Sequence, residues 1–163
     1  MLQKVTIIDV GLSNTRSVVN AFGYLGAATE VTADPKCVMS ADTLVLPGVG
    51  SFRQAAERLR RTGLADAIIY SAVDHGRKLL GICLGMQLLG RSGEEDGPTH
   101  GLNIIQSHVT PFTHDEVVGR KIPHVGFNSV RAAQTSTLFR GLPDEPDFYF
   151  VHSFRMLRTD QDL

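Results

Sequence analysis

Apolar runs alternate with amphipathic stretches along the first 90 residues. Residues 5–9 are β-branched and apolar on both faces, which is typical of a central strand in a parallel sheet covered on both sides. A helix that begins at Ser13 or Asn14 would place one apolar face inward and end at Gly26. Three residues define that face: Val18, Phe22 and Leu25. Further strands are predicted at residues 29–32, 43–46 and 78–82, with helical stretches around the last of them.

The segment between the third and fourth strands carries an apolar helical stripe that ends near Gly76. Its members recur at helical spacing: Leu64, Ile68 and Ala72 with Ala65, Ile69 and Val73. Strands that alternate with helices predict an α/β fold in layers, with a mostly parallel central sheet and flanking helices.

The pattern changes beyond Gly90. Residues 93–98 form a predicted loop, and turns separate the later apolar stretches without a convincing helix. These stretches are centred on Ile104, Val109, Val125 and residues 148–151. We therefore expect a second half rich in strands, antiparallel ones included, within one domain that spans residues 1–163.

Composition restricts the function. The chain has 163 residues, 42% of them hydrophobic, which suffices for one domain with a core. Its 16 Lys and Arg against 17 Asp and Glu give a net charge of −1 without a long run of either sign, so no nucleic acid partner is expected. No apolar run reaches the roughly 18 residues of a membrane span. With only Cys37 and Cys83, neither a disulfide scaffold nor a metal site is predicted, and we expect a cytoplasmic protein.

Cys83 is the candidate nucleophile. It lies in Gly81-Ile82-Cys83-Leu84-Gly85, a G-x-C-x-G turn between a predicted strand and helix that exposes the central side chain. A helix N-terminus favours a thiolate, which can attack a carboxamide or ester carbonyl while the N–H of Leu84 helps to hold the oxyanion. An isolated cysteine is more often a buried core residue, but this setting favours a nucleophile. Cys37 has no such setting and is predicted to be structural or merely exposed.

A second candidate feature is the glycine-rich segment 47–51. It follows a strand, and Gly48 and Gly50 can adopt positive φ so that successive N–H groups point toward a ligand. The segment could complete an oxyanion hole or could be an ordinary turn from strand to helix. Both interpretations remain open from these residues alone.

Five blocks of the sequence resemble known proteins. Residues 81–89, which contain the cysteine turn, and residues 47–52 resemble class I glutamine amidotransferases. Residues 9–18, 121–128 and 148–153 resemble, within that class, the amidotransferase subunits of imidazole glycerol phosphate synthases. The resemblance implies the layered fold of class I glutamine amidotransferases.

The resemblance also implies residue roles. Cys83 would be the nucleophile. The oxyanion would be held by the backbone of Gly48, Val49, Gly50 and Leu84. Bound glutamine would be surrounded by Gln87, Glu95, His152 and Ser153, although Glu95 alone would pass for a solvated loop charge. A partner would contact Asn14, Pro123, Phe127 and Asn128.

The implied activity is hydrolysis of glutamine to glutamate and ammonia, with no cofactor. The family passes the ammonia to a (β/α)8 barrel cyclase subunit in a heterodimer that serves histidine biosynthesis. Such a transfer requires a tight subunit interface.

Two departures from the family pattern stand out. Phe127 replaces the usual tryptophan, which keeps an aromatic ring but loses the indole N–H donor. The family's catalytic base and its orienting acid lie in a Phe-His-Pro-Glu motif, and none of the six histidines here precedes Pro-Glu. Because residues 156–163 read as sequence from the middle of a domain, we expect the domain to be incomplete at its C-terminus, with late strands missing.

Other functions remain open. A paralogous subunit could supply ammonia for surface-polysaccharide sugar synthesis. A non-catalytic interaction subunit would retain the cysteine turn and the partner face without a base. A thiol hydrolase or peptidase could carry the same turn, but Gln87 and the subunit-specific blocks argue against it.

Overall fold

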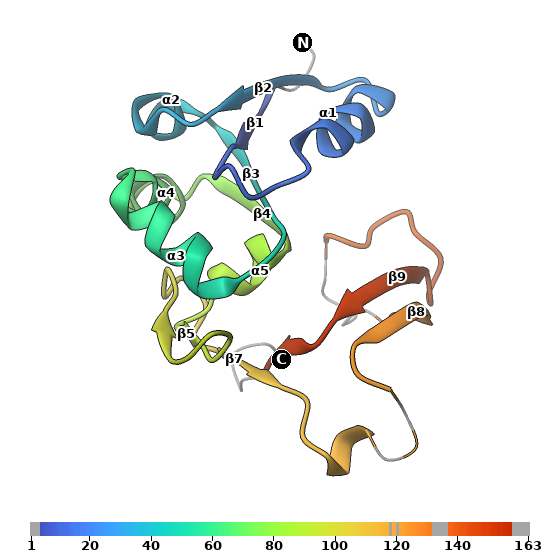
Figure 1. Ribbon diagram of the computed structural model, residues 1–163. Helices are drawn as coiled ribbons and strands as arrows, with labels where there is room; N and C mark the ends of the chain where they lie inside the picture. The colour runs from blue at the N-terminus through green and yellow to red at the C-terminus, as the bar shows by residue number, and fades with distance from the viewer. Residues whose placement is uncertain (1–3, 118, 120, 132–136, 158–163) are drawn as a thin grey trace.

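The computed structural model describes residues 4–117, 119, 121–131 and 137–157, and Figure 1 shows their arrangement. The first part of the chain contains β1 (Lys4–Ile8), α1 (Thr15–Tyr24), β2 (Ala28–Thr32), α2 (Pro35–Ser40), β3 (Thr43–Gly48), α3 (Phe52–Arg61), α4 (Leu64–Ile69), the π-helical turn η1 (Tyr70–Asp74), β4 (Lys78–Cys83) and α5 (Leu84–Leu88). The second part contains β5 (Ser92–Gly93), β6 (Thr99–His100), β7 (His108–Pro111), the 3-10 turn η2 (Asp115–Val117), β8 (His124–Ser129), β9 (Asp147–His152) and β10 (Phe154–Met156).

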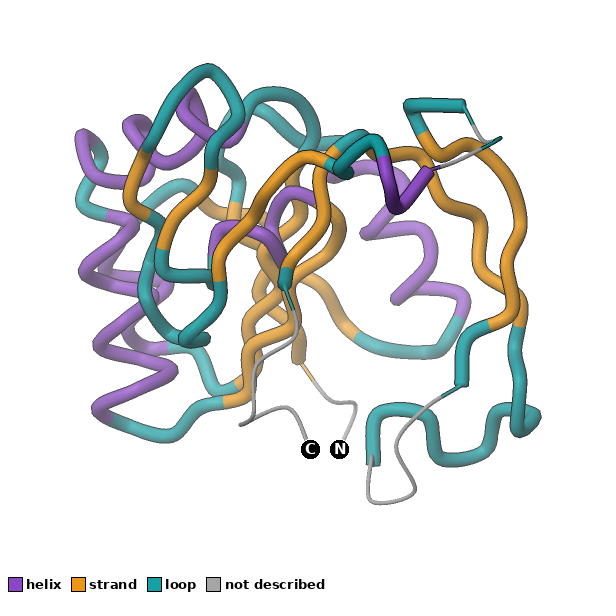
Figure 2. The backbone as a smooth tube through the Cα atoms, turned by 90° about the horizontal axis from the view of Figure 1, so that it is seen from below, coloured by secondary structure: helices purple, strands orange, loops and turns teal. Residues whose placement is uncertain are grey.

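The first part forms a parallel sheet in the order β2-β1-β3-β4. The predicted α/β fold with a parallel sheet is confirmed, and β1 lies between two neighbours as its apolar sequence indicated. Because successive side chains of a strand point to opposite faces, Ile7 packs with Val45 on one face while Ile8 packs with Leu46 on the other. Figure 2 shows helices on both sides of these strands.

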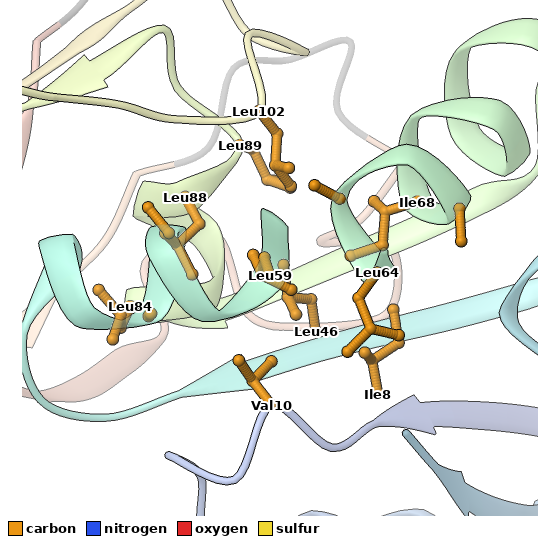
Figure 3. Close-up of a cluster of buried hydrophobic side chains, with 14 of the residues drawn as sticks. Ile8, Val10, Leu46, Leu59, Leu64, Ile68, Leu84, Leu88, Leu89 and Leu102 are labelled. Atoms are coloured by element: carbon orange, nitrogen blue, oxygen red, sulfur yellow. The ribbon is translucent and has the colours of Figure 1, made fainter. Parts of the chain in front are cut away.

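Helices α3, α4 and α5 cover one face of the sheet and build the larger core. Leu59, Leu64, Ile68 and Leu88 converge there with Leu46 of β3 (Figure 3). All five side chains are buried, and burial of such a leucine or isoleucine contributes about 1.5–3 kcal/mol. This core holds α5, and thereby the turn at Cys83, against the end of the sheet.

Helix α1 covers the other face through Val18, Val19 and Phe22. The prediction that Leu25 completes this apolar face is wrong, since its side chain is 76% exposed. The helix ends at Tyr24, and the chain turns toward β2 through Gly26 at φ +77 before another helical turn could bring Leu25 back to the sheet.

Two further local differences have physical causes. Helix α2 was not predicted, although Asp34 caps it by accepting a hydrogen bond from the Lys36 N–H (2.9 Å) and Pro35 occupies its first turn. Val73, expected within the apolar stripe, is exposed because it lies inside the π-helical turn η1, whose wider turn shifts its residues away from the α-helical spacing on which the stripe was based.

The second part is rich in strands, as predicted. A sheet in the order β10-β7-β5-β6 contains two antiparallel pairs and one parallel pair, and β8 and β9 form an antiparallel hairpin. The stretch around Ile104 is a turn rather than a strand. Residues 158–163, on which the expectation of an incomplete domain depends, lie outside the described residues. Among the helices of the described residues, none has the length and apolar character needed to cross a membrane.

Candidate active site

Strand β4 ends at Cys83 in a strained turn. Cys83 has φ 54 and ψ −117, and α5 begins at the next residue. An L-residue other than glycine rarely adopts such a conformation, and strained residues of this kind cluster at active sites. The side chain of Cys83 is exposed. The structure therefore has the predicted turn between strand and helix at Cys83, and a role for Cys83 as a buried core residue is excluded.

The glycines that flank Cys83 allow two backbones to approach closely. A Cβ atom at Gly85 would lie 1.7 Å from the Leu46 carbonyl oxygen, and one at Gly81 would lie 2.5 Å from Met86 Cα. Heavier residues would force the elements apart. The turn is thus packed directly against β3 and the first residues of α5.

A cavity of about 420 Å³ opens beside Cys83. It gathers most of the residues predicted for nucleophile, oxyanion and glutamine roles, from segments that are distant in sequence. Its lining comprises Val49, Gly50, Cys83, Leu84, Gln87, Glu95, Pro123, Val151, His152, Ser153 and Phe154. Gly48 is not part of this lining but pairs with Cys83 across β3 and β4. Such clefts at the carboxyl ends of parallel strands are the usual ligand sites of α/β sheets.

The predicted oxyanion segment has a defined backbone arrangement. Gly50 has φ +94, a conformation that favours glycine. The N–H of Val49 donates a hydrogen bond to the Leu12 carbonyl (2.8 Å), so this donor is engaged away from Cys83. Leu84 opens α5, and the first N–H groups of a helix have no intrahelical acceptor. Its N–H therefore has no acceptor within α5, as the predicted oxyanion role of this group requires.

The side chains of Glu95 and Gln87 both form hydrogen bonds with backbone groups beside the cavity. Glu95 Oε2 accepts a hydrogen bond from the Phe52 N–H at the start of α3 (2.8 Å). Gln87 Nε2 donates to the Phe154 carbonyl (3.3 Å). Glu95 is half-buried, so its interpretation as a solvated loop charge is wrong.

The residues predicted for the partner face do not lie on one surface of the hairpin. Val125, Phe127, Tyr149 and Val151 share its exposed apolar face, with the Phe127 and Tyr149 rings 5.1 Å apart. Asn128 lies on the opposite face, where its Nδ2 is 3.1 Å from His124 Nε2. Two others have separate positions, since Pro123 lines the cavity and Asn14 caps α1 by accepting from the Ser17 N–H.

The sequence profile described as Glutamine amidotransferase class-I matches residues 6–162. The chain belongs to the class I glutamine amidotransferase family. Solved structures of this family share its fold: one glutamine amidotransferase has a TM-score of 0.69 at 18% identity, covering 90% of this chain and 70% of its own. A glutamine amidotransferase of Thermotoga maritima has a TM-score of 0.57 at 15% identity, and the match covers 96% of this chain and 63% of that one.

Within this class the chain belongs with the HisH subunits of imidazole glycerol phosphate synthase. It is 47% identical to the HisH subunit of Chlorobium luteolum over 92% of this chain and 73% of that one. It is 45% identical to the HisH subunit of Geobacillus kaustophilus over 96% of this chain and 74% of that one. The predicted family and fold are confirmed.

Sequence reasoning did not identify two residues of the cavity lining, Val151 and Phe154. Phe154 contributes its carbonyl oxygen, which accepts from two side chains. A backbone acceptor has no side-chain signature, so no motif could have revealed this role. Val151 lies within the 148–153 block, and the alternation of β9 is the signal that could have assigned its face.

Proposed function

We propose that this chain hydrolyses glutamine at Cys83 as the ammonia-supplying subunit of an imidazole glycerol phosphate synthase. The observation that carries the proposal is the cavity, which brings Gln87, Glu95, His152 and Ser153 around the strained nucleophile. Glu95 supplies a carboxylate for the α-amino group of glutamine, while polar groups of the β9 end face the same space. No cofactor takes part.

The chemistry proceeds by acyl transfer. The Cys83 thiolate attacks the carboxamide carbon, a C–S bond forms, and the Leu84 N–H holds the oxyanion. The carbonyl then re-forms and the C–N bond breaks as the leaving nitrogen takes the proton that the Cys83 thiol gave up, which releases ammonia and leaves a thioester. Attack by water cleaves the C–S bond, giving glutamate and the free thiol.

The proposed partner is a (β/α)8 barrel cyclase subunit that docks on the exposed apolar face of the β8–β9 hairpin, in a cytoplasmic heterodimer. Phe127 is 72% exposed, and Val125, Tyr149 and Val151 extend the same surface. This face is continuous with the cavity because Val151 belongs to both. Ammonia released at Cys83 would therefore leave toward the covered surface rather than into bulk water. The Arabidopsis thaliana relative named imidazole glycerol phosphate synthase hisHF is a longer polypeptide, and this chain aligns with 26% of its length.

A non-catalytic interaction subunit is the second candidate. The deprotonation of Cys83 in the first candidate requires a base, and within the described part of the chain no hydrogen bond joins a histidine to Cys83 Sγ.

Ammonia release from glutamine distinguishes the two candidates. The protein is assayed with and without the barrel subunit, and Cys83→Ala is compared with Cys37→Ala. Release that Cys83→Ala abolishes and Cys37→Ala preserves establishes the glutaminase. Partner binding without release by the wild-type protein would instead establish the interaction subunit.

A further inference from the structure

Three side chains of the β8–β9 hairpin form a hydrogen-bond chain that ends at the cavity. Asn128 Nδ2 lies 3.1 Å from His124 Nε2, and His124 Nδ1 lies 2.9 Å from His152 Nε2. His152 Nδ1 in turn lies 2.8 Å from the Phe154 carbonyl oxygen. The two histidines face each other because the register of the hairpin pairs them.

The carbonyl at the end of this chain determines the direction of every bond. A carbonyl oxygen only accepts, so His152 must carry its proton on Nδ1. In a neutral imidazole the other nitrogen is an acceptor, and His152 Nε2 therefore accepts from the Nδ1–H of His124. The same rule makes His124 Nε2 the acceptor for the Asn128 amide. For two neutral rings, this pattern of contacts places the proton of each histidine on Nδ1.

Aromatic packing holds the two rings at these positions. The His124 ring stacks on Phe150 with centroids 5.3 Å apart at 23°, and the His152 ring lies 5.3 Å from that of Phe112. Both histidines are half-buried. The Phe154 carbonyl also accepts from Gln87, so one backbone oxygen orients two side chains that line the cavity.

We propose that His124 is a positioning residue for the glutamine pocket. It does not line the cavity, but its Nδ1 contact with Nε2 holds the ring orientation of His152, which does. Through Asn128, which is exposed, the hydrogen-bond chain also reaches the surface of the hairpin opposite its apolar face. The inference rests on the proposed function only for the identity of the ligand, glutamine.

NMR of isotope-labelled histidine tests the arrangement without any activity. In their neutral forms, His124 and His152 should both carry the proton on Nδ1. A neutral His152 with its proton on Nε2 would overturn the proposal. The imidazole signals of His152 should change when His124 is replaced by phenylalanine, whereas His114→Phe should leave them unaltered.

Glutamine binding to the Cys83→Ser protein tests the consequence. His124→Phe keeps a ring against Phe150 but removes the donor, and the loss of one hydrogen bond should raise the Kd about three- to tenfold. His124→Asn restores a donor near the Nδ1 position and should recover most of the affinity, while His114→Phe should have no effect. Unchanged affinity in His124→Phe, or equal losses with Phe and Asn, would overturn a positioning role. If the Cys83→Ser parent binds no glutamine, the proposed function fails and the histidine tautomers alone decide the inference.

Discussion

Gly48 is the residue that pairs with Cys83 in the parallel register of β3 and β4. A Cβ atom at Gly48 would lie 2.9 Å from the Gly85 nitrogen, so the segment that leaves β3 passes directly beside the nucleophile turn. Strand pairing therefore brings the oxyanion segment and the cysteine to the same edge of the sheet. This relationship makes the turn sensitive to very small changes in volume.

Replacement of Gly85 by alanine should disrupt the turn. The new methyl group would meet the Leu46 carbonyl oxygen at 1.7 Å, and such overpacking is expected to lower the free energy of unfolding by about 3 kcal/mol. Gly23→Ala is the matched control, because that helical glycine has open space around it and alanine should stabilise α1 by about 1 kcal/mol. Urea denaturation measures both, and equal effects would contradict the packing argument.

Replacement of Cys83 should separate strain from chemistry. Glycine adopts φ 54 and ψ −117 without strain, whereas alanine does not. The free energy of unfolding should therefore be about 1 kcal/mol higher for Cys83→Gly than for Cys83→Ala. Both variants should lack glutaminase activity. Thermal and urea denaturation provide the comparison, and identical stabilities would show that the turn is not strained.

Replacement of Glu95 should distinguish its hydrogen bond with the Phe52 N–H from its proposed contact with the α-amino group of glutamine. Glu95→Gln keeps an oxygen that can accept from the Phe52 N–H, whereas Glu95→Ala leaves the start of α3 without this cap and should cost about 1 kcal/mol. Glutamine affinity should fall in both variants, since neither retains the charge that pairs with an α-amino group. A Glu95→Gln protein with unchanged affinity would limit Glu95 to the helix cap.

Phe127→Ala should weaken partner binding without loss of stability. The side chain is 72% exposed, so its removal costs little in the free protein but should lower the affinity for the barrel subunit about tenfold. Tyr24→Ala is the control, because Tyr24 is 92% exposed on α1, away from the hairpin. Surface plasmon resonance measures the affinities, and equal losses in the two variants would exclude the hairpin as the docking face.

Acid should weaken the contact between η2 and β10. The guanidinium of Arg155, with help from Thr113, lowers the pKa of Glu116 from 4.5 to about 2. Since the pKa in the folded protein is depressed, the contribution to stability is present above pH 4.5 and is lost as the pH falls toward about 2.

The Glu116→Gln variant tests this contribution. It should be less stable than wild type above pH 4.5, and the difference should shrink as the pH falls and vanish below about 2. The effect should be small because the carboxylate is exposed. Glu94→Gln, on the loop after β5, serves as the control, and a difference that persists in acid would contradict the ion-pair explanation.

The sequence by itself determined the alternation of strands and helices, the inner position of β1 and the turn at Cys83. These features depend on local periodicity, on glycine and on the burial of apolar residues, all of which appear in neighbouring residues. The limits of helices were less predictable because caps and the π-helical turn depend on individual side chains. Leu25 and Val73 were misplaced for that reason.

Only the tertiary structure decided which polar groups meet. Glu95 and Phe52 are 43 positions apart, and His124 and His152 are 28 apart, so packing of distant segments creates these bonds. The hydrogen bond from Val49 to Leu12 likewise depends on how two loops meet at the sheet edge. Motifs predicted Cys83 as the nucleophile, whereas the orientation of the groups around it arises from long-range contacts that no local pattern encodes.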